Sequence, residues 1–489
     1  MNIIKTIQRI SRTPYWKQIL SLSSITRAPF YLVGGTIRDL LLERPVSDLD
    51  IVVSERAMAV ARHFARLVGG AFVPLDWESE TARVVLPNAV FDFSAMKGET
   101  IEEDLSKRDF TINSLAVEIE DSDRFAETLI DPFSGLHDLH AKRLAPCSDT
   151  IFMDDPLRIL RAYRLVVSLG LTMTEELPSL IKRDHANLSR TSSERIRDEL
   201  FLILSCAETE EVIRQMDTAG ILSIIFPEID PMKETGQDRY HHLDVWGHSV
   251  LALKTLEHVM NNLPEYFGQY SHQATAYLER HPVHGRPIKA LVKLATLFHD
   301  VGKPETYLKD EQGKIHFYGH AKAGGRRIGK IAKRLKLSRR ESCFLENLVS
   351  NHMHPDHLLA VETPSLRSVG RFFRKHGEDF WALFCIYYAD FLAKKGPEPK
   401  KTGLTQVRDN LIRVLSSYYE QIRPKEIAKP LLTGRDLIET LGLTPGPPFK
   451  EILEKVHEAY VEGRIQGKGE ALELVKRLLV KSEKLKVKN

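Results

Sequence analysis

The chain has 489 residues, of which 43% are hydrophobic, and its formal net charge at pH 7 is only +3. This length predicts several domains with apolar cores, and the small net charge excludes a uniformly basic protein, so that any nucleic-acid surface must come from local clusters. Because the sequence has no run of about 18 apolar residues, no signal-peptide pattern and no Cys-x-x-Cys pair, we expect a cytoplasmic protein without a membrane span, disulfide framework or zinc ribbon.

The first informative stretch is a glycine pair between a strand and a helix. Residues 31–33 are predicted to form a short apolar strand, which Gly34 and Gly35 end. Thr36 can then open a helix that carries Arg38. Consecutive glycines allow backbone N–H groups to approach a ligand closely, and phosphate is a common ligand of such turns.

Two aspartates follow in the next predicted strand, at 48–53. Asp48 and Asp50 point to the same side of this strand because successive side chains alternate. Neighbouring carboxylates repel each other unless a cation lies between them. The order strand, glycine pair, helix and Asp-x-Asp strand therefore favours a Mg²⁺ site facing a phosphate-binding turn, and the alternative is a solvated strand end.

The remainder of the first 145 residues continues this α/β pattern. The periodicity predicts a helix at 55–67 and strands at 71–75, 82–86 and 90–94. In the last of these strands Asp92 alternates with two phenylalanines and faces away from them. It is either a third carboxylate beside the first two or an ordinary polar strand residue.

Two later segments combine an apolar face with charged side chains. Segment 105–115 has the pattern of an amphipathic helix whose other face carries Arg108, Asp109 and Asn113. From about residue 149 the pattern is helical, and in segment 153–164 Asp155 and Arg158 are three residues apart on one helix face. Taken alone, this last pair could be a helix cap with an ion pair.

These motifs, G-G-T-I-R-D, D-L-D and R-D-F-T-I-N, resemble class II tRNA nucleotidyltransferases and bacterial poly(A) polymerases of the polymerase-β-like superfamily. The resemblance implies two-metal nucleotidyl transfer in which Asp48 and Asp50 hold Mg²⁺ and Asp92 is a third catalytic carboxylate. It also implies a set of nucleotide-binding residues: Gly34, Gly35, Arg38, Arg108, Asp109, Asn113, Asp155, Arg158, Arg161 and Arg164. The implied partners are a tRNA 3′ end, CTP and ATP.

In the resembled family Asp155 and Arg158 would act as a protein template for the base. A carboxylate accepts from the exocyclic amine of cytosine or adenine while a guanidinium donates to the adjacent ring acceptor, so UTP and GTP would be rejected. A similar S-E-R-I segment, here around Arg195, supports the template helix in that family.

The subtype within this family stays open. The segment 93–105 is compact, whereas CCA-adding relatives usually carry a longer flexible loop there that helps the switch from C to A. This favours a CC-adding enzyme, with a poly(A) polymerase as the next alternative. A third hypothesis makes the head an RNA-binding module only, which intact Asp48 and Asp50 argue against.

A second group of chemistry-bearing residues begins near 236, where histidines and His-Asp pairs recur in apolar helical surroundings. A single histidine there is more often a core residue, but several well-spaced ones indicate a metal site. Their order resembles the HD phosphohydrolase superfamily, which implies these metal ligands: His248, His299, Asp300, His320, His352 and Asp390. Mixed imidazole and carboxylate ligands suit Mn²⁺, Ni²⁺ or Co²⁺, and the implied chemistry is attack of a metal-activated water on phosphorus. Lys303 could hold substrate phosphate.

The chain is therefore predicted to have four parts. We expect an α/β polymerase-β-like nucleotidyltransferase head (1–145), an all-α neck (146–235), an all-α HD domain (236–395) and a helical tail (396–489) with possible RNA contact. A Pro- and Lys-rich linker is expected at 394–401, and segment 432–446 suggests two helices around a tight glycine turn, although an ordinary helix turn fits as well. The oligomeric state and the HD substrate stay open.

Overall fold

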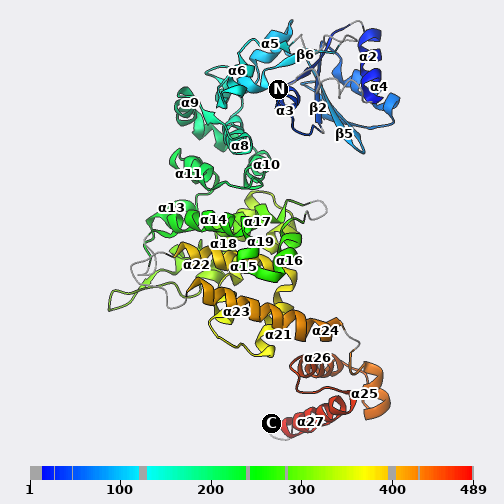
Figure 1. Cartoon of the computed structure of the whole chain (residues 1–489), viewed down its shortest axis with the longest axis vertical. Coiled ribbons are helices and arrows are strands. Elements are labelled where there is room, and N and C mark those ends of the chain that lie inside the picture. Colours follow the sequence, from blue (N-terminus) through cyan, green and yellow to red (C-terminus); the bar gives the residue numbers. More distant parts are fainter. Residues whose placement is uncertain are drawn as a thin grey trace. The chain divides into compact units, whose positions relative to one another are not determined.

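The computed structural model describes residues 14–26, 28–46, 48–119, 129–237, 243–280, 285–394, 403–427 and 430–486 (Figure 1). It divides into two compact units. Unit 1 comprises Met1–Cys206 and Glu211–Ile225, and unit 2 comprises Ala207–Glu210 and Phe226–Asn489. Most of the expected lysine-rich linker, residues 395–401, lies outside the described residues. No helix within the described ranges has the length and apolarity needed to cross a bilayer.

Unit 1 begins as a mixed α/β structure and ends as a helical one. Its elements in chain order are α2 (Pro14–Thr26), β1 (Phe30–Val33), α3 (Gly35–Leu41), β2 (Asp48–Val53), α4 (Ala57–Val68), β3 (Ala71–Asp76), β4 (Thr81–Leu86), β5 (Ala89–Ala95), α5 (Ile101–Ser106), η1 (Thr111–Asn113), β6 (Ala116–Glu118), β7 (Leu129–Ile130), α6 (Gly135–His140), β8 (Arg143–Leu144), α7 (Ile151–Asp154), α8 (Arg158–Leu169), β9 (Thr172–Met173), α9 (Glu176–Asp184), η3 (His185–Arg190), α10 (Ser193–Leu204), α11 (Glu210–Thr218) and α12 (Ile221–Ile225). The expected α/β head followed by helices is thus confirmed.

The head sheet has seven strands in the order β3-β4-β5-β2-β1-β6-β7. Its central pair, β2 and β5, is parallel, and the other pairs are antiparallel. Phe64 of α4 packs on Phe91 and Phe93 of β5, with ring centroids 4.9 Å and 5.4 Å apart. These aromatic contacts bury one face of β5, so its alternate residues are left at the opposite face.

One local prediction in unit 1 is wrong. Segment 105–115 is not one helix: α5 ends at Ser106, and only the single 3₁₀ turn η1 follows before β6. Its polar residues occupy irregular backbone, where Asn and Asp commonly bond to the chain itself. By contrast, Asp155 lies just before α8 and accepts from the Leu157 amide, in agreement with the helix cap considered from the sequence.

Unit 2 is built mainly from helices. Its elements are α13 (Ile229–Glu234), α14 (Val245–Asn261), α15 (Leu263–Phe267), η4 (Gly268–Tyr270), α16 (Ser271–Leu278), α17 (Ile288–Leu297), η5 (Pro304–Thr306), β10 (Leu308–Lys309), β11 (Ile315–His316), α18 (His320–Arg334), α19 (Arg339–Asn351), α20 (His354–Leu359), α21 (Leu366–His376), η6 (Gly377–Asp379), α22 (Phe380–Ala393), α23 (Leu404–Ser416), η7 (Ser417–Ile422), α24 (Arg423–Ile427), α25 (Gly434–Leu441), α26 (Pro448–Val461) and α27 (Lys468–Lys486). The small antiparallel hairpin β10–β11 departs from the all-α expectation.

The core of unit 2 forms around α22. This helix is apolar on nearly all sides, as expected for a helix surrounded by others, and it packs against α14 and α17. Tyr388 of α22 is fully buried and donates to the Tyr266 carbonyl at 3.1 Å.

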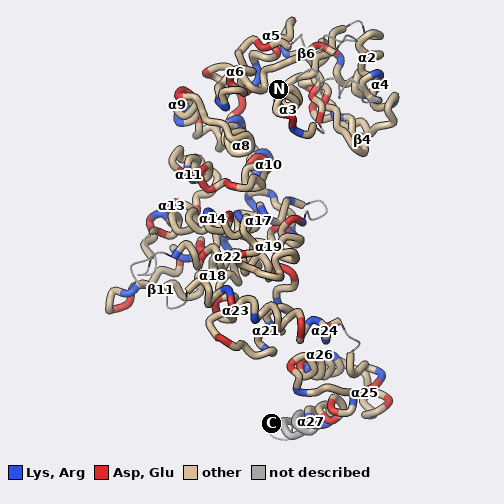
Figure 2. Tube along the Cα trace, in the orientation of Figure 1, with Lys and Arg blue, Asp and Glu red and all other residues tan. Residues whose placement is uncertain are grey.

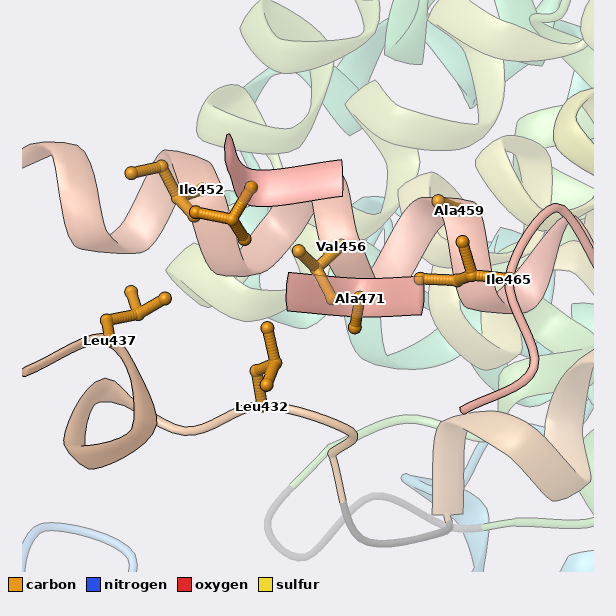
Figure 3. Close-up of a cluster of buried hydrophobic side chains, with 8 residues drawn as sticks. Leu432, Leu437, Ile452, Val456, Ala459, Ile465 and Ala471 are labelled. Atoms are coloured by element: carbon orange, nitrogen blue, oxygen red, sulfur yellow. The ribbon is translucent and has the colours of Figure 1, made fainter. Parts of the chain in front are cut away.

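The tail has a small core of its own (Figure 3), which includes Leu432, Leu437, Ile452, Val456 and Ile465. Thr433 begins α25 with a capping box, and the helix ends at Gly442. The next helix begins only at Pro448, so the expected tight glycine turn between two helices is wrong and an extended connection takes its place.

A buried ion pair fixes the short crossing segment 207–210 to unit 2. Lys293 of α17 donates to Glu257 of α14 at 2.7 Å and to the Ala207 carbonyl at 2.9 Å. The same Glu257 oxygen accepts from the amide and hydroxyl of Thr209 at 2.7 Å and 2.6 Å. Lys293 and Glu257 are 2% and 4% exposed, so each needs the other's charge.

We expect Lys293→Met to destabilise unit 2, because it leaves the Glu257 carboxylate buried without its cation. The loss should be about 3–5 kcal/mol in the free energy of unfolding, measured by urea denaturation. Lys289→Met, which removes an accessible lysine of α17 whose nearest acid, Glu279, is itself exposed, should change it by less than about 0.5 kcal/mol. Equal effects of the two substitutions would contradict the buried-pair explanation.

Candidate active sites

Unit 1 contains a polar cavity of about 440 Å³ at the end of the head sheet. Its lining includes these residues: Val33, Gly34, Gly35, Arg38, Asp50, Thr81, Asp92, Ser94, Lys97, Asp104, Lys107, Arg108, Asp109, Asn113, Arg158, Arg161 and Arg164. Most residues expected to bind a nucleotide therefore share one cavity, whereas Asp48 and Asp155 are not among the lining residues. The many cations suit a polyanionic ligand such as a triphosphate.

Gly34 lines the cavity in a backbone conformation that leaves no space for a side chain. Its φ of 67° is favourable for glycine alone, and a Cβ there would lie 2.8 Å from Nη1 of Arg108. However, its N–H donates to the Leu115 carbonyl at 3.0 Å, so it is not available to a phosphate as the sequence suggested. The neighbouring amide of Gly35 begins α3, where helix amides lack partners within the helix.

Asp50 and Asp92 are direct partners in the parallel β2–β5 register, and Asp48 lies two residues before Asp50 on the same strand. Thr36 fixes this strand end, because its hydroxyl accepts from the Asp50 amide at 2.8 Å. Burial, together with the charges of Asp92 and Asp48, raises the pKa of Asp50 although Arg108 and Thr36 act in the opposite direction. A cation at this edge would relieve that repulsion.

Asp92 is held by Arg83, a residue that sequence reasoning missed. The two are cross-strand partners in β4–β5, and the guanidinium donates to both carboxylate oxygens at 2.8 Å. Such two-bond pairs fix both side chains. The predicted third carboxylate is therefore adjacent to Asp50 but already paired with an arginine.

A hydrogen-bonded network connects the glycine turn to the 3₁₀ turn. Arg38 donates to the Asn113 side-chain oxygen at 2.6 Å, and the Asn113 amide nitrogen donates to Asp109 at 2.9 Å. Arg161 reaches the second Asp109 oxygen at 3.0 Å. Although burial opposes it, Arg161 and the hydrogen bonds from Asn113 and Phe110 hold the pKa of Asp109 below its usual range. Asp109 is thus a fixed anion beside the cavity.

The expected base-reading pair is not an ion pair. Asp155 accepts from Arg195 at 2.7 Å, and its other oxygen caps the Leu157 amide at 3.1 Å. Arg158 instead donates to the Lys107 carbonyl at 2.8 Å. The alternative of an Asp155–Arg158 ion pair is therefore wrong, and each side chain is positioned by a different neighbour.

Unit 2 brings all six predicted metal ligands together in two groups. His248, His299 and Asp390 offer ligand atoms within 4.8 Å of one another. Asp300, His320 and His352 do the same in the second group. The groups adjoin, because His299 Nε2 lies 3.1 Å from an Asp300 oxygen.

The histidine rings are oriented so that their Nε2 atoms face the carboxylates. In His299, His320 and His352 the Nδ1 atom contacts a backbone carbonyl at 2.7–2.8 Å, which fixes Nδ1 as the protonated nitrogen and leaves a lone pair on Nε2. Burial lowers the pKa of His352 to about 3 and that of His248 to about 4, so both rings are neutral at pH 7. His299 Nε2 is buried without a hydrogen bond.

Two lysines complete this cluster. Lys303 contacts Asp300 at 2.7 Å and Gln237 at 2.6 Å, and Lys394 donates to Asp390 at 2.7 Å. Lys303 is only 6% exposed, so its ammonium already has two partners inside the cluster. The donor set of imidazole and carboxylate fits one or two transition-metal ions.

Sequence reasoning missed several residues that organise the unit 1 cavity. Arg83 could have been found from the register of the 82–86 and 90–94 strands, because the turn between them places it opposite Asp92. Glu199, which accepts from Arg161 and Arg164, had no local signal. Its role depends on the fold that brings α10 against α8.

Comparison with known proteins gives three family matches along the chain. Residues 30–145 match the model "Poly A polymerase head domain". Residues 170–233 match "Probable RNA and SrmB- binding site of polymerase A", and residues 405–475 match "tRNA nucleotidyltransferase domain 2 putative".

Full-length relatives are also similar. The A-adding tRNA nucleotidyltransferase of Deinococcus radiodurans is 32% identical over 91% of this chain and 94% of its own length. The CC-adding enzyme of Geobacter sulfurreducens is 31% identical over 93% of this chain and 94% of its own. A Thermotoga maritima CCA-adding enzyme solved with tRNA has the same fold, with a TM-score of 0.62 and 22% identity over 95% of this chain and 94% of that one.

We expect Arg161→Gln to destabilise unit 1 by about 1–3 kcal/mol at pH 7, because Asp109 would remain buried and ionised without its guanidinium. In the native protein the lowered pKa of Asp109 contributes stability that is complete above its unfolded pKa and is lost as pH falls through the folded pKa. In the variant burial would raise that pKa, so protonation relieves the cost as pH falls. The difference in unfolding free energy should therefore shrink between pH 7 and pH 4.

Urea unfolding at several pH values measures this difference, with Arg161→Lys as the control that keeps the charge. A difference that stays constant over this pH range would assign the loss to packing instead.

Proposed function

The chain belongs to the class II tRNA nucleotidyltransferase family, and from this we propose that it adds nucleotides to the 3′ end of tRNA from CTP, ATP or both. The observation that carries the proposal is the unit 1 cavity, where Asp50 and its partner Asp92 face a set of arginines. Oxygen-only carboxylate ligands suit Mg²⁺, and burial together with the neighbouring carboxylates raises the pKa of Asp50, so a cation here would be stabilising. We also propose the domain limits 1–145, 146–235, 236–395 and 396–489.

The reaction forms a bond between the RNA 3′-oxygen and the α-phosphorus, breaks the bond from that phosphorus to the β-phosphate oxygen, and releases pyrophosphate. Bound Mg²⁺ would lower the pKa of the 3′-hydroxyl and stabilise the leaving pyrophosphate. Asp48 and Asp50 would hold it. Arg38 and Arg108 line the cavity beside Gly35 and would bind the triphosphate, and Asp109 and Asn113 would orient the sugar.

Base choice is assigned to Asp155 and Arg158. Arg195 and the Leu157 amide orient the Asp155 carboxylate, and the Lys107 carbonyl orients the Arg158 guanidinium. Because each is held independently, the two can present an acceptor and a donor to one base edge, the pattern that cytosine and adenine match. Arg161 and Arg164 supply positive charge deeper along the same helix.

We infer a partial adder, that is, an enzyme that adds CC or the terminal A but not all three. Among relatives similar in sequence, those that align over about nine tenths of the chain are named A-adding or CC-adding enzymes, whereas multifunctional CCA relatives align over about two thirds or less. The solved CCA-adding enzyme that covers 95% of the chain shares its fold at only 22% identity. The compact connection from β5 to α5, residues 96–100, supports the same inference.

A second activity is favoured by the histidine–aspartate cluster of unit 2. We propose that it binds one or two ions of Mn²⁺, Ni²⁺ or Co²⁺ through His248, His299, Asp300, His320, His352 and Asp390 and hydrolyses a phosphate ester. Water adds its oxygen to phosphorus, the phosphorus–oxygen bond to the sugar breaks, and the sugar oxygen leaves with a proton. When bound, the ions would activate water and neutralise the phosphate. The convergence of six ligand atoms in two adjoining groups supports this assignment.

Asp50→Asn should abolish incorporation of labelled nucleotides into tRNA that lacks its 3′ CCA. We expect a loss of roughly a thousandfold or more, because several kcal/mol of charge stabilisation disappear with the metal. Sequencing of the 3′ ends made with CTP, ATP, UTP or GTP alone and in mixture distinguishes C, CC, CCA, single-A and poly(A) products.

The matched control is Asp76→Asn, which changes an exposed aspartate at the end of β3 and should leave incorporation unchanged. Normal incorporation by Asp50→Asn would refute the proposed active site. A complete CCA end made by the native chain alone would refute the partial-adder inference.

His299→Ala should remove divalent-metal-dependent hydrolysis of a 2′,3′-cyclic nucleotide or a phosphomonoester and leave nucleotide addition intact, because the two centres use separate residues. The bound metal, measured by elemental mass spectrometry, should fall as well. His354→Ala is the control, since His354 contacts His376 rather than either metal group. Loss of nucleotide addition together with hydrolysis would indicate a structural role for the cluster.

A further inference from the structure

The six-residue cluster of unit 2 opens toward solvent at His320. The His320 side chain is 16% exposed, whereas those of His248, His299 and His352 are 1–2% exposed and that of Asp390 is 11% exposed. His320 is also the first residue of α18, a 15-residue helix whose N-terminus favours a negative charge. A phosphate that reaches the cluster would therefore enter beside the start of α18.

An exposed aromatic side chain lies close in sequence to His320. Tyr318 is 71% exposed and precedes His320 by two residues, with Gly319 in the left-handed conformation between them. The ring stacks on His316 with centroids 5.2 Å apart and an interplanar angle of 9°. His316 is in turn held by Asp310 at 2.7 Å across the β10–β11 hairpin. One face of the Tyr318 ring thus packs on His316, and most of the ring is accessible to solvent.

The exposed face of α18 is strongly basic. Lys322, Arg326 and Lys330 follow one another at intervals of four residues, and Lys333 lies on the same face. Successive members are about 6 Å apart along the helix axis. The helix has no acidic residue, so it carries blue but no red positions in Figure 2.

Few acids neutralise these cations. Glu305 is shared by Arg326 and Arg327 at 3.2 Å and 2.8 Å. Lys322, Lys330 and Lys333 have no acidic partner among the described residues. Lys322, Lys330 and Lys333 are thus unneutralised cations on one helix face, an arrangement typical of contact with a phosphate backbone.

We propose that Tyr318, Lys322, Arg326 and Lys330, which we call the α18 surface, bind a single-stranded RNA end and deliver its terminal phosphate ester to the histidine–aspartate cluster. The terminal base stacks on Tyr318, and the preceding phosphates follow the cations of α18. The proposal rests on the hydrolase activity proposed above and specifies its substrate class as an RNA strand rather than a free nucleotide. Stacking on an aromatic ring tolerates any base, so we expect little sequence preference.

The test uses the full chain loaded with Mn²⁺ and a five-nucleotide RNA with a 3′-terminal phosphate. Tyr318→Ala should raise the KM for this RNA roughly 5- to 150-fold, because stacking of one base is worth about 1–3 kcal/mol, and Tyr318→Phe should retain the native KM. Lys322→Gln combined with Lys330→Gln should raise the KM for the RNA but not that for a mononucleotide. It should also reduce the slope of log KM against log salt by about 1.4. Lys450→Gln, at an exposed lysine of α26, is the charge control.

A second arm does not depend on hydrolysis. The same RNA with a terminal 4-thiouridine is cross-linked by light to metal-free protein, and mass spectrometry should locate the adduct at Tyr318 or α18. Absence of hydrolysis by the native protein with a normal cross-link would refute the hydrolase activity and retain the RNA surface. A cross-link outside these residues, or equal KM values for RNA and mononucleotide, would overturn the α18 surface.

Discussion

The structure of the head depends on how it tolerates carboxylates that meet at one sheet edge. The parallel register of β2 and β5 places Asp50 against Asp92, with Asp48 on the same strand. Three carboxylates this close in the strand register repel one another and oppose folding unless cations compensate their charge. Arg83 compensates Asp92, and Arg108 contributes to the compensation of Asp50. Burial and the neighbouring carboxylates still raise the pKa of Asp50, so that a cation at this edge would be stabilising.

Unit 2 meets the same problem with different residues. Its buried carboxylates, Asp300 and Asp390, each lie against a lysine, and imidazoles surround them. The backbone carbonyls that contact Nδ1 of three histidines decide which nitrogen remains free for a ligand. Thus unit 1 combines carboxylates with arginines, and such oxygen ligands suit a hard ion, whereas unit 2 combines carboxylates with imidazoles, which suit a softer one.

Residue periodicity predicted the strands of the head well, because side chains alternate strictly in a strand and strands such as β4 and β5 have one buried face. Local sequence was less informative where a polar side chain forms a hydrogen bond with a residue far away in the sequence. Segment 105–115 has helical periodicity, yet Asp109 and Asn113 bind Arg161 and Arg38 and hold the backbone in one 3₁₀ turn. Likewise Asp155 pairs with Arg195, forty residues away, rather than with the nearby Arg158. Tertiary contacts of this kind override a local preference.

Residues 207–210 belong to unit 2 although they lie between two parts of unit 1 in the sequence, and this limits how the two units could be separated. Because residues 211–225 return to unit 1, the polypeptide passes between the units three times. A single proteolytic cut therefore cannot give two products that each contain one whole unit and no residue of the other. A gene fragment that starts at residue 226 would also lack the Ala207 carbonyl and the Thr209 hydroxyl that complete the environment of Lys293 and Glu257. A fragment of unit 2 would therefore keep this buried environment only if it begins at or before residue 207.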